Sequence, residues 1–100
     1  LPKPGEGPSR EQREAGHYEL FFHGAHPADR ALDMRVRVAG QLDPGYGSTS
    51  RMLAEAAVCL ARDPLTVGGG FWTPASGLGD HLLTRLVENA GLTFEEVPLE

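Results

Sequence analysis

Residues 32–38, Leu-Asp-Met-Arg-Val-Arg-Val, decide how the rest of the sequence is interpreted. Apolar residues alternate with charged ones along this stretch, a pattern typical of a β-strand with one covered and one solvent-facing side. Residues 17–23 show mostly the same alternation, which is broken at Phe21. Because the link over residues 24–30 is short, the two strands are expected to form an antiparallel hairpin.

Two helices and a last strand are predicted after the hairpin. The first helix begins at the hydroxyl residues 48–50, any of which can cap it, and ends at Arg62 before Asp63-Pro64. Small alanines in its apolar stripe are expected to let it lie close to a sheet, and the stripe comprises Leu53, Ala56, Ala57 and Leu60. The second helix is predicted from Thr73 to Gly91, and residues 92–99 form the last strand.

The N-terminal region is predicted to be an extended arm followed by a short helix. Residues 1–8 alternate Pro and Gly, whereas Ser9 and Gln12 have the spacing of a capping box. Residues 9–100 then form a single domain. The order of elements predicts an α+β fold, in which a small antiparallel sheet carries two main helices on one face, with a short N-terminal helix added.

Composition restricts the class of partner and the cellular compartment. The net charge is −5 and no basic cluster occurs, which argues against nucleic acid and anionic membranes as partners. The single cysteine, Cys59, argues against a disulfide-stapled secreted fold, so we expect a buried thiol in a cytoplasmic protein. The longest apolar run, residues 56–61, is far too short to span a bilayer.

No complete catalytic signature occurs in the sequence. Gly45 and Gly47 supply the first two glycines of a dinucleotide fingerprint, but Ser50 stands at the third position. A phosphate-loop lysine motif and a nucleophile elbow are also absent. His23 and His26, with Asp29 nearby, are interpreted as turn residues, and no metal site is assigned. His81 is interpreted as a surface histidine on the last helix.

Two turn-rich connections carry the candidate binding residues, because each leads into a helix N-terminus. A helix N-terminus offers free N–H groups that can bind an anion. Trp72 can line a ligand site, although burial in a core or an interface is the more ordinary role of such an aromatic. The substrate- or anion-binding candidates are Tyr46, Gly47, Ser48, Thr49, Arg51, Trp72 and Thr73.

Three blocks of the sequence resemble the C-terminal end of saccharopine dehydrogenase-like oxidoreductases. They read PKPGEGPSREQREAG, DPGYGSTSRMLAEAAVCLA and GGGFWTPASGLGDHLLTRLVENAGLTFE, and their order and spacing match over residues 2–97. The resemblance is to the bacterial branch, which includes the trans-acting enoyl reductases. It implies that this chain closes the second domain of a longer protein whose missing N-terminal Rossmann domain binds NAD(P).

The resemblance also implies that this second domain contacts the substrate and a second subunit, as in a homodimer. It transfers no catalytic residue to the chain, which is not expected to be active alone or to hold a cofactor itself. One alternative is a non-catalytic protein-interaction or self-association module with an exposed strand. Another is a small anion binder that acts through residues 48–51.

Overall fold

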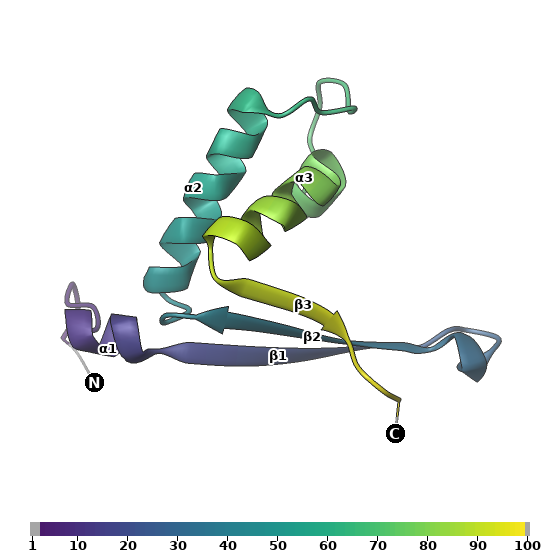
Figure 1. Ribbon diagram of the computed structural model, residues 1–100, viewed down its shortest axis with the longest axis horizontal. Coiled ribbons are helices and arrows are strands. Elements are labelled where there is room, and N and C mark those ends of the chain that lie inside the picture. Colours follow the sequence, from purple (N-terminus) through teal and green to yellow (C-terminus); the bar gives the residue numbers. More distant parts are fainter. Residues whose placement is uncertain (1–2, 100) are drawn as a thin grey trace.

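The chain folds into a three-stranded sheet, two long helices and a short N-terminal helix (Figure 1). This computed structural model describes residues 3–99, so residues 1 and 2 of the predicted arm lie outside the described residues. The architecture confirms the α+β fold predicted from the sequence. Its elements are α1 (Arg10–Ala15), β1 (His17–Gly24), the 3₁₀ turn η1 (Arg30–Leu32), β2 (Met34–Gln41), α2 (Gly47–Arg62), α3 (Pro74–Asn89) and β3 (Leu92–Glu96).

The sheet is antiparallel throughout, with β2 in the centre and β1 and β3 at the edges. Since directly opposed residues of neighbouring strands point to the same side, the register separates two faces. The apolar face carries Tyr18, Leu20, Phe22, Met34, Val36, Val38, Leu92 and Phe94, and the polar face carries Glu19, Phe21, His23, Arg35, Arg37, Thr93 and Glu95.

Charged side chains connect all three strands on the polar face. The Arg37 guanidinium on β2 lies 2.7 Å from a carboxylate oxygen of Glu19 on β1 and 2.7 Å from one of Glu95 on β3. These contacts lower the pKa of the Glu19 carboxyl, chiefly through its hydrogen bond with Arg37. Arg35 lies 5.4 Å from the centre of the Phe21 ring, at cation–π distance. The polar face is therefore organised around arginines of the central strand.

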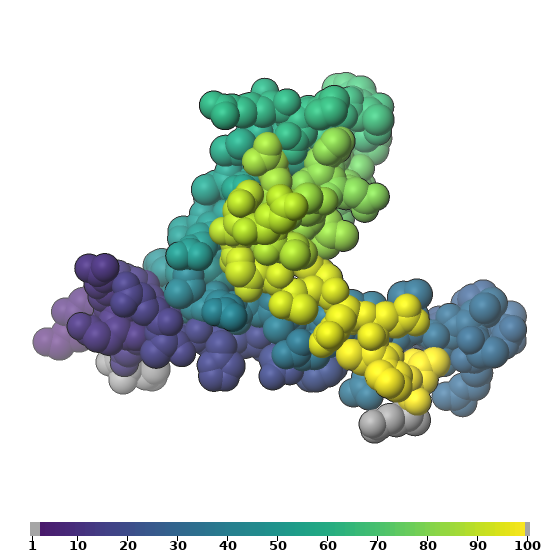
Figure 2. Space-filling view, viewed as in Figure 1, coloured from purple at the N-terminus to yellow at the C-terminus, as the bar shows by residue number. Residues whose placement is uncertain are grey.

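The helices cover only part of the apolar face. α2 packs against α3, and α3 packs against β3, whereas the β1–β2 hairpin extends beyond them to the tip at residues 25–33 (Figures 1 and 2). Cys59 is buried between the helices, as predicted, and Leu82, Ala90 and Leu92 complete the buried apolar core. Leu20 and Phe22 on β1 remain about half exposed.

The apolar stripe of α2 does not face the sheet, so that prediction was wrong. Leu53 and Leu60 are 70% and 68% exposed, and the buried residues of this helix are Ser48 and Cys59. The sequence shows that one side of the helix is apolar, but not which neighbour covers it. Because α3 lies beside the Cys59 side of α2, the Leu53 side stays open.

Three predicted boundaries shift for local reasons. β2 begins at Met34 rather than Leu32, because the Asp29 carboxylate accepts the Ala31 N–H and holds residues 30–32 in a 3₁₀ turn. α2 begins at Gly47, before the hydroxyl residues expected to cap it. β3 ends at Glu96 rather than residue 99, close to Pro98, which lacks a backbone donor for the ladder.

A glycine interrupts α3 near its start. Thr73 caps the helix through a capping box with Ser76, and Pro74 occupies the first helical position, as predicted. Gly79 then has φ 56° and ψ −140°, a conformation that essentially only glycine adopts. The helix consequently kinks near its start, and Leu82, in the part after the kink, is buried.

The described chain is extended for its length. Its radius of gyration is 16.4 Å, compared with roughly 13 Å for a compact domain of this size. Trp72 is about half exposed and its neighbour Phe71 is fully exposed, so neither belongs to the core, whereas the predicted interface role of Trp72 stays a prediction. No helix among residues 3–99 combines the length and apolarity needed to cross a membrane.

Candidate functional site

The loop before α2 encloses one of its own carboxylates. Asp43 Oδ1 accepts the N–H groups of Gly45 and Tyr46 at 3.1 and 2.9 Å, and Asp43 Oδ2 accepts that of Gly47 at 2.7 Å. A carboxylate at a helix N-terminus also interacts favourably with the helix dipole. The N–H groups on which the anion-site prediction depends therefore already have an anionic partner.

The charge of Asp43 is stabilised by this arrangement. Partial desolvation acts to raise the pKa of the carboxyl, but the backbone hydrogen bonds from Gly47, Tyr46 and Gly45 outweigh it, so the pKa is lowered. Positively charged Arg13 on α1 contributes in the same direction. The Asp43 N–H also donates to the Arg13 carbonyl at 3.0 Å, which attaches this loop to α1.

The hydroxyl residues of the first α2 turn are used within the fold. Ser48 is fully buried, and its hydroxyl lies 2.7 Å from the Tyr18 hydroxyl on β1. The Thr49 hydroxyl donates to the Pro44 carbonyl, and the Ser50 hydroxyl donates to the Gly47 carbonyl. Among the candidates of this loop, Tyr46, Thr49 and Arg51 are exposed.

Tyr46 lines a shallow pocket of about 410 Å³ between the N-terminal arm and α2. The ring lies against Gly7, at which a Cβ would approach it to 3.3 Å. The other lining residues are Gly5, Pro8, Arg13, Gly47 and Ser50. One guanidinium, that of Arg13, is the charged group of this pocket, and it donates to the Pro8 carbonyl.

Trp72 and Thr73 line a different, mostly apolar depression, which we call the α2–α3 groove. It has a volume of about 460 Å³ and runs along the open apolar side of α2. Its lining residues are Leu53, Ala56, Ala57, Leu60, Leu65, Val67, Gly70, Trp72, Thr73, Pro74, Gly77 and Leu78. None of these side chains ionises, so the groove favours an apolar occupant over a charged one.

The polar atoms at the end of the α2–α3 groove are already hydrogen-bonded. Trp72 Nε1 donates to the Gly68 carbonyl at 2.9 Å, and the Thr73 hydroxyl lies 2.7 Å from that of Ser76. The indole lies so close to α3 that a Cβ at Gly77 would come within 2.8 Å of the Trp72 Cβ. These contacts hold the indole in place as one wall of the groove.

The two groups of candidate residues do not meet. Residues 46–51 lie at the start of α2, near the sheet, whereas Trp72 and Thr73 border the groove beside Leu53 and Leu60 (Figure 1). Sequence reasoning found both connections because each precedes a helix. It could not show that the helix starts lie apart, because that depends on how α2 and α3 cross.

A bidentate ion pair fixes the crossing of the two helices. The Arg85 guanidinium on α3 donates to both carboxylate oxygens of Asp63, at 2.7 and 2.8 Å, and lies 3.6 Å from Glu55 on α2. Hydrogen bonding to Arg85 lowers the pKa of the Asp63 carboxyl, and the same bond raises the pKa of Arg85. Sequence analysis missed this pair, whose members are far apart along the chain.

The buried thiol of Cys59 lies beneath this ion pair. Desolvation raises the pKa of the thiol, and the neighbouring Asp63 carboxylate acts in the same direction. A thiol held in its neutral form is a poor nucleophile. Cys59 therefore serves as a packing residue between the helices.

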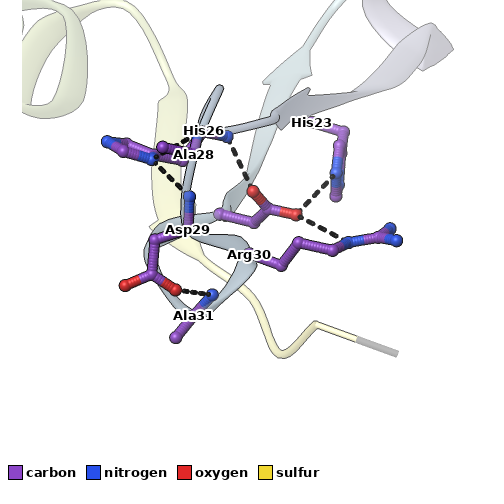
Figure 3. Close-up of polar contacts among 7 residues, drawn as sticks. His23, His26, Ala28, Asp29, Arg30 and Ala31 are labelled. Atoms are coloured by element: carbon purple, nitrogen blue, oxygen red, sulfur yellow. Dashed lines mark hydrogen bonds and ion pairs between the residues drawn. The ribbon is translucent and has the colours of Figure 1, made fainter.

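His23 lies near the end of β1, and His26 and Asp29 lie in the hairpin tip, where their contacts organise a turn (Figure 3). His26 Nδ1 accepts the N–H groups of Ala28 and Asp29 at 3.2 and 2.9 Å, which uses the ring nitrogen nearest the backbone. The Asp33 carboxylate accepts the His26 N–H and lies 3.7 Å from His23 Nε2. Within residues 3–99, no three His, Cys, Asp or Glu side chains are grouped so that they could hold a metal.

The sequence of this chain matches trans-acting enoyl reductases of mycobacteria. It is 41% identical, over 99% of its length, to a Mycobacterium tuberculosis protein provisionally named a trans-acting enoyl reductase, of which it covers 23%. It is also 41% identical over 85% of its length to the trans-acting enoyl reductase of Mycobacterium bovis, and 39% identical to that of Mycobacterium ulcerans.

The chain is homologous to one part of these enoyl reductases. It spans about a fifth to a quarter of their length, since it covers 20 to 23% of each. No family model and no solved structure matches the chain. The longest match extends over almost the whole sequence, so the residues of the α2–α3 groove and of the Asp63–Arg85 pair lie within the matched part of this chain.

Proposed function

We propose that this chain is the substrate-facing and subunit-contacting part of an NAD(P)-dependent oxidoreductase of the saccharopine dehydrogenase-like type, in which a separate Rossmann domain binds the cofactor. The homology to enoyl reductases over 99% of the chain is the observation that carries this proposal. The single cysteine suits the reducing cytoplasm, which we propose as its compartment.

The loop of this chain that most resembles a dinucleotide fingerprint does not fit a pyrophosphate. The N–H groups of residues 45–47 donate to Asp43, and the negative charge of this carboxylate would repel a second anion. Close approach of a pyrophosphate to a helix start requires free N–H groups and a third glycine. This supports a cofactor site in another part of the oxidoreductase.

The α2–α3 groove is the surface that we assign to the substrate. An enoyl group is an acyl chain with a double bond next to its carbonyl, and most of such a chain is apolar. The groove offers Leu53, Leu60 and the Trp72 ring, without an ionisable side chain. The groove would hold the acyl group of the substrate. The hydride and the proton would come from groups that lie outside residues 1–100.

A groove-filling substitution tests this assignment in the longer protein that contains these residues. Ala57→Trp places a large ring in the groove, whereas Ala54→Trp on the same helix lies outside it. We expect Ala57→Trp to raise the KM for a long-chain enoyl thioester about tenfold or more, as NAD(P)H oxidation reports, with little change for Ala54→Trp. Equal kinetics of the two variants would contradict the assignment.

The second candidate function is a non-catalytic interaction or self-association module. The observation that favours it is the large exposed apolar area, which includes Leu20 at 49%, Phe22 at 54% and Met34 at 50% exposure. Patches of this kind mark protein interfaces. Purified longer protein that binds no NAD(P)H and oxidises none with any enoyl thioester would favour this candidate over the enzyme.

A further inference from the structure

The two edges of the sheet differ in how they resist pairing with another strand. β3 is short, ends with the consecutive residues Glu95 and Glu96, and is followed closely by Pro98. Charge, brevity and proline are the devices by which natural proteins block an exposed edge. β1, in contrast, is eight residues long and contains no lysine and no proline. Within residues 3–99, one edge is therefore protected and the other is open.

β1 also presents apolar side chains on both of its faces. Leu20 and Phe22 lie on the apolar face, and Phe21 lies on the polar face at 55% exposure. An exposed, long, apolar edge strand pairs readily with another strand. Among residues 3–99, β1 forms a ladder with β2 alone.

We propose that β1 pairs antiparallel with β1 of a second copy of this protein, about a two-fold axis that passes beside Phe21. The β1–β1 pairing would be the contact between two subunits of the proposed oxidoreductase, and its biological role rests on that proposed function. Two three-stranded sheets would then join into one six-stranded sheet. An interface of this kind is isologous, because each strand offers the same residues to the other.

Sequence complementarity selects this register. In an antiparallel pair about a two-fold axis, residues on the same face must oppose each other, so the axis passes beside a residue of β1 rather than between two. An axis beside residue 20 or residue 21 pairs the greatest length of the eight-residue strand. With the axis at Phe21, Glu19 opposes His23 of the second copy, and the imidazole N–H can donate to the carboxylate. With the axis at Leu20, the charged Glu19 would instead oppose the apolar Phe21 ring.

Apolar and aromatic pairs are also matched in the Phe21 register. Leu20 opposes Phe22 of the second copy on the apolar face, and the two Phe21 rings oppose each other on the polar face. Tyr18 opposes Gly24, which has no side chain, so the Tyr18 ring can stay over Gly40 of its own sheet in this pairing. Arg35 lies over Phe21 and would shield the pair of rings from water.

Cysteine cross-linking in the longer protein that contains these residues tests both the contact and its register. In the proposed pairing the two residues 21 have Cα atoms about 4.5 to 5.5 Å apart, which suits a disulfide. The two residues 20 are diagonal neighbours at about 7 to 8 Å, which does not. We expect Phe21→Cys to form a covalent dimer on mild oxidation, at least fivefold more than Leu20→Cys or the unsubstituted protein.

A cysteine on the other edge strand, β3, is the matched control for cross-linking. Sedimentation measures association of the protein without any introduced cysteine. Glu95→Cys on β3 is expected to cross-link no more than the unsubstituted protein. Analytical ultracentrifugation of the unsubstituted protein at micromolar concentration is expected to give twice the mass of one polypeptide. Circular dichroism of each variant verifies that the exposed substitutions leave the fold intact.

Three results would overturn the proposal: a monomeric mass, equal cross-linking of Phe21→Cys and Leu20→Cys, or equal cross-linking of Glu95→Cys. A monomeric mass would mean that β1 does not pair with a second copy. None of these measurements involves NAD(P)H or an enoyl thioester. Failure of the dimer contact is therefore distinguishable from failure of the proposed oxidoreductase function, which the kinetic experiment reports.

Discussion

The hydroxyl groups of Tyr18 and Ser48 lie 2.7 Å apart and join β1 to the first turn of α2. Tyr18 reaches this position because it lies across Gly40, where a Cβ would overlap the ring. Ser48 is fully buried, so its hydroxyl depends on this contact for a partner outside its own helix. The contact fixes the start of α2 on the apolar face of the sheet.

Tyr18→Phe is expected to destabilise the fold by about 1 to 3 kcal/mol, because it leaves the buried Ser48 hydroxyl without its partner. Urea unfolding of the variant and of the unsubstituted protein measures this difference. Tyr46→Phe is the matched control, since the Tyr46 side chain is 60% exposed, and it is expected to change stability little. Equal effects of the two substitutions would contradict the role assigned to Tyr18.

Acid is expected to weaken the contact between α2 and α3 through Asp63. The hydrogen bonds from Arg85 hold the pKa of the Asp63 carboxyl below its usual value. In the unfolded chain the same carboxyl has a pKa of about 3.9. The stabilisation is thus complete above the unfolded pKa and is lost as the pH falls from about 5 through the folded pKa.

Asp63→Asn is expected to lower stability at pH 7 and to flatten the dependence of stability on pH in the acid range. Urea midpoints measured from pH 7 down to the onset of acid unfolding test this. Asp80→Asn changes an exposed carboxylate on α3 and serves as the control. A profile for Asp63→Asn as steep as that of the unsubstituted protein would show that another carboxylate dominates acid unfolding.

Gly79→Ala is expected to destabilise the protein by about 1 to 3 kcal/mol through backbone strain alone. The φ of 56° with ψ of −140° disfavours every residue that has a Cβ, although open space surrounds the site. Thermal unfolding measures the loss, and Gly68→Ala in the preceding loop is the control. Unchanged stability would mean that α3 straightens without cost.

Asp43→Ala is expected to turn the start of α2 into an anion site. Removal of the carboxylate frees the N–H groups of residues 45–47 and weakens the fold, and phosphate should then restore part of the lost melting temperature. Phosphate is expected to leave the melting temperature of the unsubstituted protein unchanged. A phosphate-dependent rise in the unsubstituted protein would mean that the anion binds elsewhere.

Local sequence signals predicted most elements of this fold, because the forces that start and stop an element act over a few residues. The capping boxes at Ser9 and Thr73 and the alternation over residues 32–38 each correspond to an observed element. Asp43 also carried a local signal, since Asp-Pro-Gly is typical of a turn in which the Asp side chain binds N–H groups ahead of it.

Tertiary relations were not predictable from those signals. The Asp63–Arg85 pair joins two helices, and an arginine on a helix surface gives no indication of which carboxylate it meets. The apolar stripe of α2 predicted a buried face, but the α2–α3 groove leaves this face open. For the same reason the candidate residues of the two helix starts could be found, but not their separation.

The central position of β2 has a consequence for the order in which this protein folds. β1 and β2 are joined by the short tip at residues 25–33, whereas residues 42–91, with both long helices, separate β2 from β3. Closing the shorter loop costs less chain entropy, so the hairpin can form early from local contacts. We therefore expect β3 to pair with β2 only after α2 and α3 have packed together, so that its docking completes the sheet.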